Sequence, residues 1–331
     1  MKGLLSLSKE DQLLVFEQIR SATGMSVAVI EKDWWVTQTL RIIFAMDVAK
    51  SLVFKGGTSL SKAWGLIERF SEDIDLALDR TFLGFDSEMT QSQVRKLREK
   101  SFSYISEGFY PQLISEFTKT GLKGASLTLG EIKDHDQDPL MIEIYYPSIV
   151  KPDQYVQPRV LVEIGSRSLR EPFTLRSICS IIGEHSKGKP FADEPIEIPT
   201  VNPERTFLEK VFLLHEEFQK PVEKIRVVRL SRHLYDLEKI MDTPFGKVAM
   251  EDKQLYHTIV EHRKTITRIR GIDYDNHSPD KIDFLPPKEL MNDWKKDYET
   301  MQESMIYGKS LQFEKLIERM EELKNRFRKI V

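Results

Sequence analysis

Residues 54–78, FKGGTSLSKAWGLIERFSEDIDLAL, decide the fold expected for this chain. A short apolar run at residues 51–55 ends at Gly56-Gly57. Residues 58–67 then carry apolar side chains at the spacing of a helix. The segment therefore predicts a strand, a tight glycine turn and a helix in that order.

The end of the same segment predicts a second strand with a polar face. Residues 72–78 alternate, with Asp73 and Asp75 on one side and apolar residues on the other, as in a half-buried strand. Two carboxylates that project from one face of a strand can hold one or two Mg²⁺ ions, which bridge to phosphates. We therefore expect a divalent-metal site at this strand.

The glycine turn complements the two aspartates. Glycine lets a ligand approach the backbone closely, and the first amides of the following helix suit a triphosphate. The hydroxyls of Thr58 and Ser59 can add hydrogen bonds, and we also expect Lys62 to contact the nucleotide. Taken alone, a Gly-Gly turn is usually only a turn, and an Asp-x-Asp pair is usually solvated. Their combination predicts nucleotide chemistry.

The remaining chain predicts an α/β or α+β fold with two domains. Amphipathic patterns indicate helices at residues 9–20, 29–46 and 87–120. Alternating runs indicate strands, expected as antiparallel additions to the sheet, at residues 125–131, 140–146 and 159–164. A loop-like, proline-containing stretch at residues 183–203 is the candidate domain boundary. Beyond it we expect a helical bundle with helices at residues 205–218, 231–241, 251–268, 287–307 and 311–328.

Composition limits the classes of protein and of site. The 331 residues are 40% hydrophobic and 31% charged, with a net charge of -3 and a pI near 6.2; such proportions indicate a folded protein, and any RNA contact must come from a local patch. Cys179 is the single cysteine, which excludes an internal disulfide and a thiolate-rich zinc site. His135, His215 and His233 lack metal-ligand spacing, so zinc is not expected. The sequence has neither a secretory pattern nor an apolar run of about 20 residues, and we expect a cytoplasmic protein with no membrane segment.

Four segments together resemble a known family. Residues 56–78 resemble the first two motifs of the AbiEii/AbiGii-type nucleotidyltransferase toxins, a branch of the polymerase β-like superfamily. ERTFLEK, residues 204–210, resembles the third motif, and RHLYDL, residues 232–237, resembles the fourth. EKDWW, residues 31–35, is similar to a segment of the family's N-terminal helix. The matches run in order from about residue 26 to 240, and the last hundred residues match no motif.

The resemblance implies a fold and a set of site residues. The fold would be a polymerase β-like mixed sheet flanked by helices within residues 1–200, with a helical domain at 201–331 closing over the nucleotide. The nucleotide-binding residues would be Gly56, Gly57, Thr58 and Ser59. The metal-binding carboxylates would be Asp73 and Asp75. Lys210 would contact the triphosphate, which its compact charge also suits. Asp236 would complete the site from the helical domain, although it can also pair with Arg232 one helical turn earlier.

A third carboxylate is expected on a neighbouring strand, where Glu143 and Glu163 are both available. We favour Glu163, because Gly165-Ser166-Arg167 after it resembles the family's sequence at this place. Arg167 could then reach phosphate. Relatives in the polymerase β-like superfamily often have aspartate where this chain has the longer glutamate.

Two further features admit an ordinary structural role. Trp34 and Trp35 fit core residues better than a base-stacking platform. A basic cluster could bind nucleic-acid phosphates or form a solvated face; its members are Lys224, Arg226, Arg229, Arg232 and Lys239.

The expected activity is transfer of a nucleoside monophosphate from a nucleoside triphosphate (NTP) to an acceptor hydroxyl, with Mg²⁺ or Mn²⁺. Asp73, Asp75 and Glu163 would hold the metal, and Lys210 would stabilise charge as pyrophosphate leaves. Family analogy implies a tRNA 3′ end as acceptor and a toxin paired with an antitoxin. The alternatives are a protein or small-molecule acceptor, and a non-catalytic module that binds a nucleotide or a partner.

Overall fold

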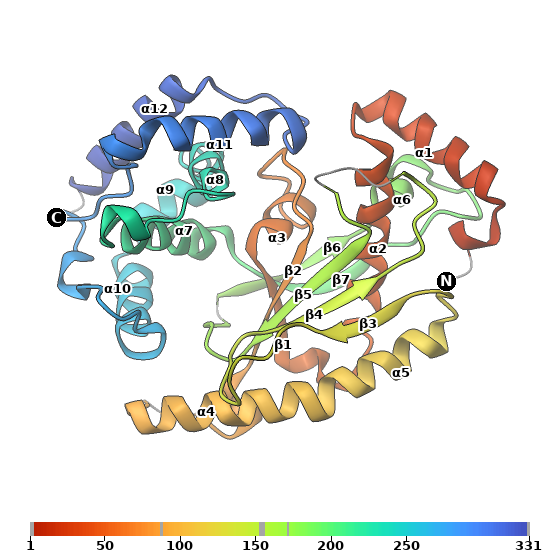
Figure 1. Ribbon diagram of the computed structural model, residues 1–331, viewed down its shortest axis with the longest axis horizontal. Helices are drawn as coiled ribbons and strands as arrows, with labels where there is room; N and C mark the ends of the chain where they lie inside the picture. Colours follow the sequence, from red (N-terminus) through yellow and green to blue (C-terminus); the bar gives the residue numbers. More distant parts are fainter. Residues whose placement is uncertain (1–2, 87–88, 152–155, 171, 330–331) are drawn as a thin grey trace. The chain divides into compact units, whose positions relative to one another are not determined.

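The chain divides into two units in the computed structural model, which describes residues 3–86, 89–151, 156–170 and 172–329 (Figure 1). One unit, here called the sheet unit, comprises Met1–Trp64 and Phe70–Val201. The other, the helical unit, comprises Gly65–Arg69 and Asn202–Val331. The short Gly65–Arg69 segment thus lies with the helical unit, although its neighbours on both sides belong to the sheet unit.

A mixed sheet forms the centre of the sheet unit. Within the described residues it has 7 strands in the order β3-β4-β5-β2-β1-β7-β6. Their bounds are β1 Leu52–Lys55, β2 Asp73–Leu78, β3 Ser126–Leu129, β4 Leu140–Tyr145, β5 Arg159–Gly165, β6 Phe173–Ile178 and β7 Ile196–Val201. The expected mixed sheet flanked by helices is therefore confirmed.

The pairing of the strands differs from the sequence expectation in one respect. β3 with β4, and β4 with β5, pair antiparallel as expected. The expectation is wrong for the other edge of β5, which pairs in parallel with β2. Residue alternation is the same in parallel and antiparallel strands of a half-buried sheet, so the pattern could not distinguish them.

The predicted loop at residues 183–203 is also partly wrong, because it contains β7. β7 pairs antiparallel with β6, with Pro199 opposite Leu175, and meets β1 in parallel at Thr200. Pro199 removes a backbone donor, which is why prolines usually indicate the absence of a strand.

Helices cover the sheet unit's apolar side chains. They are α1 Lys9–Thr23, α2 Val27–Ile43, α3 Gly56–Lys62, α4 Gln91–Ser103, α5 Tyr110–Thr120 and α6 Ile181–His185, with a π-helical turn, η4 Tyr104–Phe109, joining α4 to α5. α2 packs against β2, β5 and α5 (Figure 1). Almost all of its residues are buried. Ile74, Leu76 and Leu78 of β2 are at most 1% exposed, which leaves the alternate residues on the other, partly exposed face.

Two of these helices differ from their predicted bounds. α3 ends at Lys62 rather than at residue 67, and Gly65, with φ +61, has a left-handed backbone that does not continue a helix. The helix predicted for 87–120 corresponds to α4, η4 and α5; its first two predicted residues, Ser87 and Glu88, lie outside the described residues.

The helical unit has the expected all-helical structure after its first segment. Its helices are α7 Pro203–Phe218, α8 Ser231–Ile240, α9 Pro244–Glu251, α10 Lys253–His262, α11 Met291–Ser304 and α12 Phe313–Phe327, with a π-helical turn, η6 Arg263–Thr267, after α10. α7 packs against α8, α9 and α10. The sequence prediction missed α9, which begins with the Thr243 N-cap and Pro244 at its first turn, a recognisable start signal.

In the described part of the chain, no single helix is long and apolar enough to cross a membrane, and only the pair α1 and α2, bent by 107°, passes on length and composition.

Candidate active site

The glycine turn and the aspartate strand meet at Gly56 and Asp75. β1 and β2 pair antiparallel with Lys55 opposite Asp75, so the turn after Lys55 lies beside that aspartate. Gly56 has φ +81, and a Cβ atom there would lie 1.9 Å from Oδ2 of Asp75. Only glycine fits this backbone and this contact without displacement. The glycine turn and the Asp75 carboxylate therefore lie next to each other in the sheet unit.

The hydroxyls of Thr58 and Ser59, which follow the glycines, stabilise the turn through buried hydrogen bonds. Thr58 Oγ1 donates to the carbonyl oxygen of Asp73 at 2.5 Å and is hydrogen-bonded to Ser71 Oγ at 3.0 Å. Ser59 Oγ donates to the carbonyl oxygen of Gly56 at 2.8 Å. Both side chains are fully buried. In this arrangement they fix the first turn of α3 against β2, which differs from the direct phosphate contact expected from the sequence.

Glu163 lies next to the two aspartates on the partly exposed face of the sheet. β2 and β5 run parallel with Asp75 opposite Glu163. Because neighbouring strands lie about 4.8 Å apart, side chains opposite each other on one face are within reach of a common ligand. The three carboxylates therefore line one strip of the sheet.

Glu143, the alternative third carboxylate, lies one strand further from the aspartates. It is opposite Leu161 of β5 and binds Arg159 at 2.8 Å and the hydroxyl of Tyr145. The Tyr145 hydrogen bond, followed by the charge of Arg159, holds the pKa of Glu143 below its usual value despite some burial. Glu143 is thus committed to these partners, and Glu163 has the better position.

The chemistry of Asp73, Asp75 and Glu163 fits Mg²⁺ that is shared with a substrate. In the part of the chain that the structure describes, no group of three or more His, Cys, Asp or Glu side chains forms a ready-made metal cage. Mg²⁺ does not require one, since it is commonly bound by one or two carboxylates together with substrate phosphates and water. The oxygen donors of the strip match that mode of binding.

Lys62, expected to contact the nucleotide, is engaged within the sheet unit. Its Nζ lies 2.5 Å from Oδ1 of Asp33 on α2, and both side chains are largely buried. The other oxygen of Asp33 accepts from the backbone N–H of Ile181 at 2.7 Å. The pair therefore ties α3 to α2 and to the start of α6.

Arg167 follows β5 and lies near both Asp138 and Glu163. Burial lowers the pKa of Arg167, and the charge of Asp138, then that of Glu163, opposes this shift. Within the described residues, its buried Nε has no hydrogen-bond partner. A guanidinium in this state is a candidate phosphate contact.

Lys210 and Asp236 come together in the core of the helical unit. Lys210 Nζ on α7 lies 2.8 Å from Oδ2 of Asp236 on α8 and 3.4 Å from Nδ1 of His233. Arg69 donates to both oxygens of Asp236, each at 2.7 Å. All four residues are within the helical unit, because Arg69 belongs to its first segment.

The electrostatics of this cluster keep Asp236 ionised. Burial alone would raise the pKa of Asp236, but Arg69 and then Lys210 outweigh it and hold the pKa far below its usual value. Burial, only partly opposed by Asp236, lowers the pKa of Lys210. Burial and Lys210 hold the pKa of His233 well below its usual value, so that imidazole is neutral. Asp236 therefore acts on its neighbours as a fixed, fully buried negative charge.

Sequence reasoning missed Arg69 and also the buried pair of Lys32 and Glu72. Arg69 is 1% exposed, Lys32 is 1% exposed and Glu72 is 7% exposed. Each lies within the motifs that carry the family resemblance, which is the one signal that could have selected them. Their partners are far away in sequence, so spacing alone could not.

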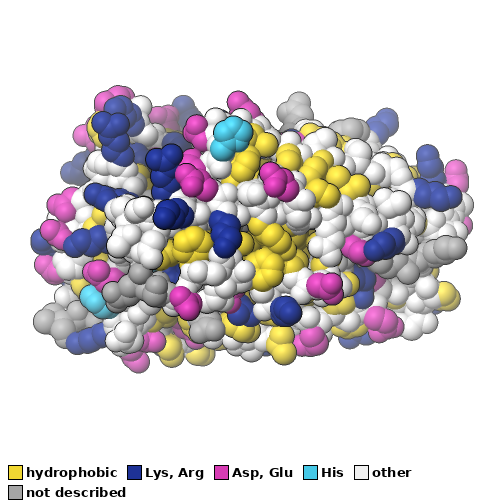
Figure 2. Space-filling view, turned by 90° about the horizontal axis from the view of Figure 1, so that it is seen from below, with side chains coloured by type: hydrophobic (Ala, Val, Ile, Leu, Met, Phe, Trp, Pro, Cys, Tyr) yellow, Lys and Arg dark blue, Asp and Glu magenta, His cyan; other side chains and the backbone are white. Residues whose placement is uncertain are grey.

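The basic cluster at residues 224–239 is partly paired within the helical unit. Arg226 binds Glu217 through its backbone N–H and its guanidinium, and Lys239 lies over the ring of Tyr235 at 5.5 Å. Figure 2 shows one face of the molecule, on which Lys and Arg side chains, several of them gathered toward the left, lie among scattered Asp and Glu side chains and a central group of apolar side chains. These contacts favour a structural role for Arg226 and Lys239.

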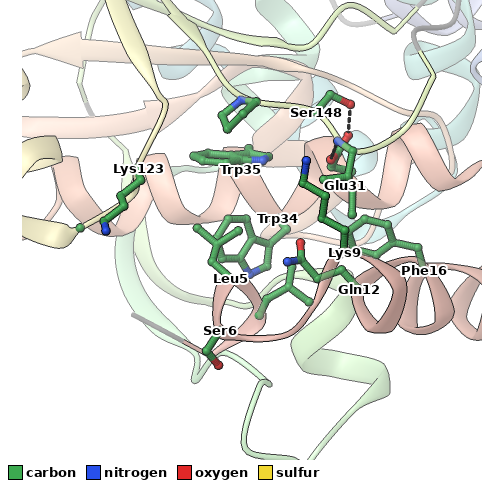
Figure 3. A pocket seen from close by; sticks show the side chains of 14 residues that line it. Leu5, Ser6, Lys9, Gln12, Phe16, Glu31, Trp34, Trp35, Lys123 and Ser148 are labelled. Carbon is green, nitrogen blue, oxygen red and sulfur yellow. Dashed lines mark hydrogen bonds between the residues drawn. The ribbon is translucent and has the colours of Figure 1, made fainter.

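A cavity of about 380 Å³ lies away from the carboxylate strip (Figure 3). Among its lining residues are Lys9, Trp34, Trp35 and Lys123, and none of the predicted site residues lines it. Trp34 and Trp35 are only 3% and 2% exposed, and Trp35 stacks on Tyr146 at 5.0 Å. The expectation that the two tryptophans are core residues is confirmed.

Comparisons with known proteins agree with the motifs. A family model described as "Nucleotidyl transferase AbiEii toxin, Type IV TA system" matches residues 40–321. Two solved structures are similar to the chain. The nucleotidyltransferase toxin MenT4 of Mycobacterium tuberculosis is 18% identical, with 97% of this chain and 98% of that chain covered and a TM-score of 0.43. JHP933 of Helicobacter pylori is 14% identical, with 88% of this chain and 90% of that chain covered and a TM-score of 0.38. No curated protein matches the chain. The family match confirms the resemblance inferred from the sequence.

Proposed function

Because the chain belongs to the AbiEii family of nucleotidyl transferase toxins of type IV toxin–antitoxin systems, we propose that it transfers a nucleoside monophosphate from an NTP to an acceptor hydroxyl. The proposed site is the carboxylate strip of Asp73, Asp75 and Glu163, together with the turn at Gly56-Gly57. The proposed acceptor is the 3′ end of a tRNA.

The contact of Gly56 with Asp75 carries this proposal. Triphosphate and metal must be held together for phosphoryl transfer, because the ion bridges phosphate oxygens to the protein. The absence of a side chain at Gly56 leaves backbone beside Oδ2 of Asp75, where a Cβ atom would lie 1.9 Å away. A phosphate that binds the turn is thereby brought next to the carboxylate.

Different residues of the chain would bind the metal, contact the phosphates and hold the glycine turn in position. Asp73 and Asp75 present oxygen ligands from one face of β2, with Glu163 opposite Asp75 on β5. Bound Mg²⁺ or Mn²⁺ would neutralise charge on the phosphates and favour the ionised acceptor hydroxyl. Arg167 is the proposed phosphate contact in the sheet unit. Lys210 lies in the core of the helical unit, paired with Asp236, and its contact with the triphosphate stays a prediction from the family resemblance. Thr58 and Ser59 hold the turn in place.

The reaction follows from this arrangement. The acceptor oxygen forms a bond to the α-phosphorus, and the bond from that phosphorus to the bridging oxygen of the β-phosphate breaks. Pyrophosphate leaves with the bonding electrons, and the hydroxyl proton passes to solvent. Fixed cations beside the phosphates stabilise the charge that develops on the leaving group.

Labelling identifies the acceptor and tests the proposal. Purified protein is incubated with a cell extract and each of the four NTPs labelled at the α-phosphate, and RNA and protein are then separated. The proposal predicts label on RNA of tRNA size from the wild-type protein and none from Asp73→Ala. Label on protein or on a small molecule would contradict the tRNA acceptor, and equal labelling by Asp73→Ala would contradict the site.

A further inference from the structure

Lys32, in the first half of α2, contacts the segments just before both strands that carry the carboxylate strip. Its Nζ lies 2.5 Å from Oε2 of Glu72, the residue immediately before β2. The same nitrogen donates to the carbonyl oxygen of Gln157, two residues before β5, at 3.0 Å. β2 and β5 are parallel neighbours, so their starts lie at the same edge of the sheet. One ammonium group therefore joins the two strands at that edge.

The helix that carries Lys32 is itself fixed by the residues on either side. Glu31 accepts from the backbone N–H of Ile149 at 2.9 Å. It also accepts from the hydroxyl of Ser148, the hydrogen bond that is dashed in Figure 3. Asp33 accepts from Ile181 and pairs with Lys62. Successive residues of a helix point in different directions, so these contacts reach separate segments of the sheet unit. They leave α2 little freedom to rotate or slide.

The contacts of Lys32 have a direct geometric consequence for the strip. Asp73 follows Glu72 in the chain, and Asp75 is opposite Glu163 in the pairing of β2 with β5. A shift of either strand's start changes the separation of carboxylates on the two strands. Ligands must be held within fractions of an ångström, and the partners that orient them affect metal binding and rate.

We propose that Lys32 is a positioning residue for the metal-binding carboxylates: it holds Glu72 and Gln157 so that Asp73, Asp75 and Glu163 face one bound divalent ion. This inference rests on the proposed function. Lys32 lies on α2, and its proposed role is to orient the starts of β2 and β5 through its buried ammonium group.

The test measures Mn²⁺ affinity of the full-length protein by electron paramagnetic resonance. The main variant is the double substitution Lys32→Met/Glu72→Gln, which removes both charges of the buried pair and so avoids leaving one buried charge uncompensated. The second is Glu72→Gln alone, which keeps Lys32 and an acceptor oxygen. Comparison with Asp73→Ala shows how much of the measured Mn²⁺ binding depends on the carboxylate strip.

A pair at the other end of β2 supplies the matched control. Arg170 binds Asp79, which follows β2, at 3.0 Å and donates to the carbonyl oxygen of Lys50. The double substitution Arg170→Met/Asp79→Asn also removes an ion pair of the sheet unit, but away from the starts of β2 and β5. We expect it to leave Mn²⁺ affinity unchanged.

The main variant should fold with wild-type circular dichroism and bind Mn²⁺ about 10- to 100-fold more weakly, as is typical when partners of metal ligands are removed. Glu72→Gln should fall between it and the wild type. In transfer assays, the Mg²⁺ concentration for half-maximal rate should rise in parallel, with the KM for NTP at saturating Mg²⁺ little changed. Wild-type Mn²⁺ affinity in any folded variant of the pair would overturn the proposal.

The same measurements separate this proposal from the proposed function. If the wild-type protein releases no pyrophosphate from any NTP, the proposed function fails, whereas loss of Mn²⁺ binding in the Lys32 variants still supports the positioning role. If the wild type is active and the Lys32 variants match it in Mn²⁺ affinity and Mg²⁺ dependence, the positioning role alone fails.

Discussion

Gly56 contacts Asp75 so closely that a methyl group on Gly56 would lie 1.9 Å from the Oδ2 atom of that aspartate. They are 19 positions apart in the sequence, but the antiparallel pairing of β1 and β2 brings them together. Glycine is required there for two reasons, because its φ is +81 and because the carboxylate fills the space of a side chain. The contact joins the proposed phosphate-binding turn to the proposed metal-binding strand.

Gly56→Ala should therefore abolish most of the activity. The substitution forces Asp75 or the turn to move, and a displacement of about 1 Å at a reacting group costs on the order of 100-fold in rate. Pyrophosphate release measures the effect. Gly24→Ala is the matched control, since Gly24 has φ +76 and nothing within 4 Å of its added Cβ. It should destabilise by about 1 kcal/mol, the cost of left-handed backbone, and keep wild-type activity; equal activity in the two variants would contradict the role of the contact.

Glu163→Gln should impair Mg²⁺-dependent transfer far more than Glu143→Gln. Glu163 lies opposite Asp75, whereas Glu143 is engaged by Arg159 and Tyr145. We expect an activity loss of about 10- to 100-fold for the first variant, by analogy with the loss of one metal-site partner, and less than about 3-fold for the second. Transfer rates over a Mg²⁺ titration check this. The reverse order would assign the third carboxylate to β4.

Asp236→Asn should destabilise the helical unit by about 3–5 kcal/mol at neutral pH, because it leaves Arg69 and Lys210 buried without their carboxylate. The pKa of Asp236 is depressed in the folded protein, so the carboxylate stabilises above its unfolded pKa of about 4, and this contribution diminishes as pH falls below that value. Urea unfolding at pH 7 and pH 3 should show a smaller difference from wild type at pH 3. A difference that grows on acidification would contradict the assigned charge.

Cys179 should react slowly with iodoacetamide in the folded protein. Burial, then the nearby Asp193, raises the pKa of this thiol to about 12. At pH 8 the thiolate fraction should be on the order of 1000-fold lower than for a free cysteine of pKa about 8.5, and the thiolate is the reactive form. Mass spectrometry of native and urea-unfolded protein measures the two rates. Equal rates would show that the thiol is not perturbed.

The local parts of the site could be predicted from the sequence. β2 alternates clearly, which places Asp73 and Asp75 on one face from the sequence alone, and Gly56-Gly57 indicates the turn. The family of the chain followed from the order of four short motifs, and the match over residues 40–321 confirms it. The change from a mixed sheet-and-helix segment to an all-helical one after residue 203 follows from hydrophobic periodicity.

Long-range features could not be predicted in this way. Whether β5 runs parallel to β2 depends on the path of the chain. β7 could not be recognised as a strand because it contains Pro199. The Gly65–Arg69 segment looks like the end of a helix, yet Arg69 binds Asp236, which is 167 residues further along the chain. Likewise, Lys32 and Glu72 are 40 residues apart. Buried ion pairs of this kind carry no sequence periodicity, because each depends on one contact between distant segments.

Pyrophosphate release by Asp75→Asn is the most direct test of metal-dependent nucleotidyl transfer at the carboxylate strip. Asparagine keeps the shape of Asp75 but lacks its charge, so the fold should persist. With Mg²⁺, the preferred NTP and the acceptor, we predict release by the wild type in step with acceptor labelling, and a rate lower on the order of 100- to 1000-fold for the variant, as for loss of one transition-state contact. A folded Asp75→Asn protein that releases pyrophosphate at the wild-type rate over the same Mg²⁺ range would contradict the central claim.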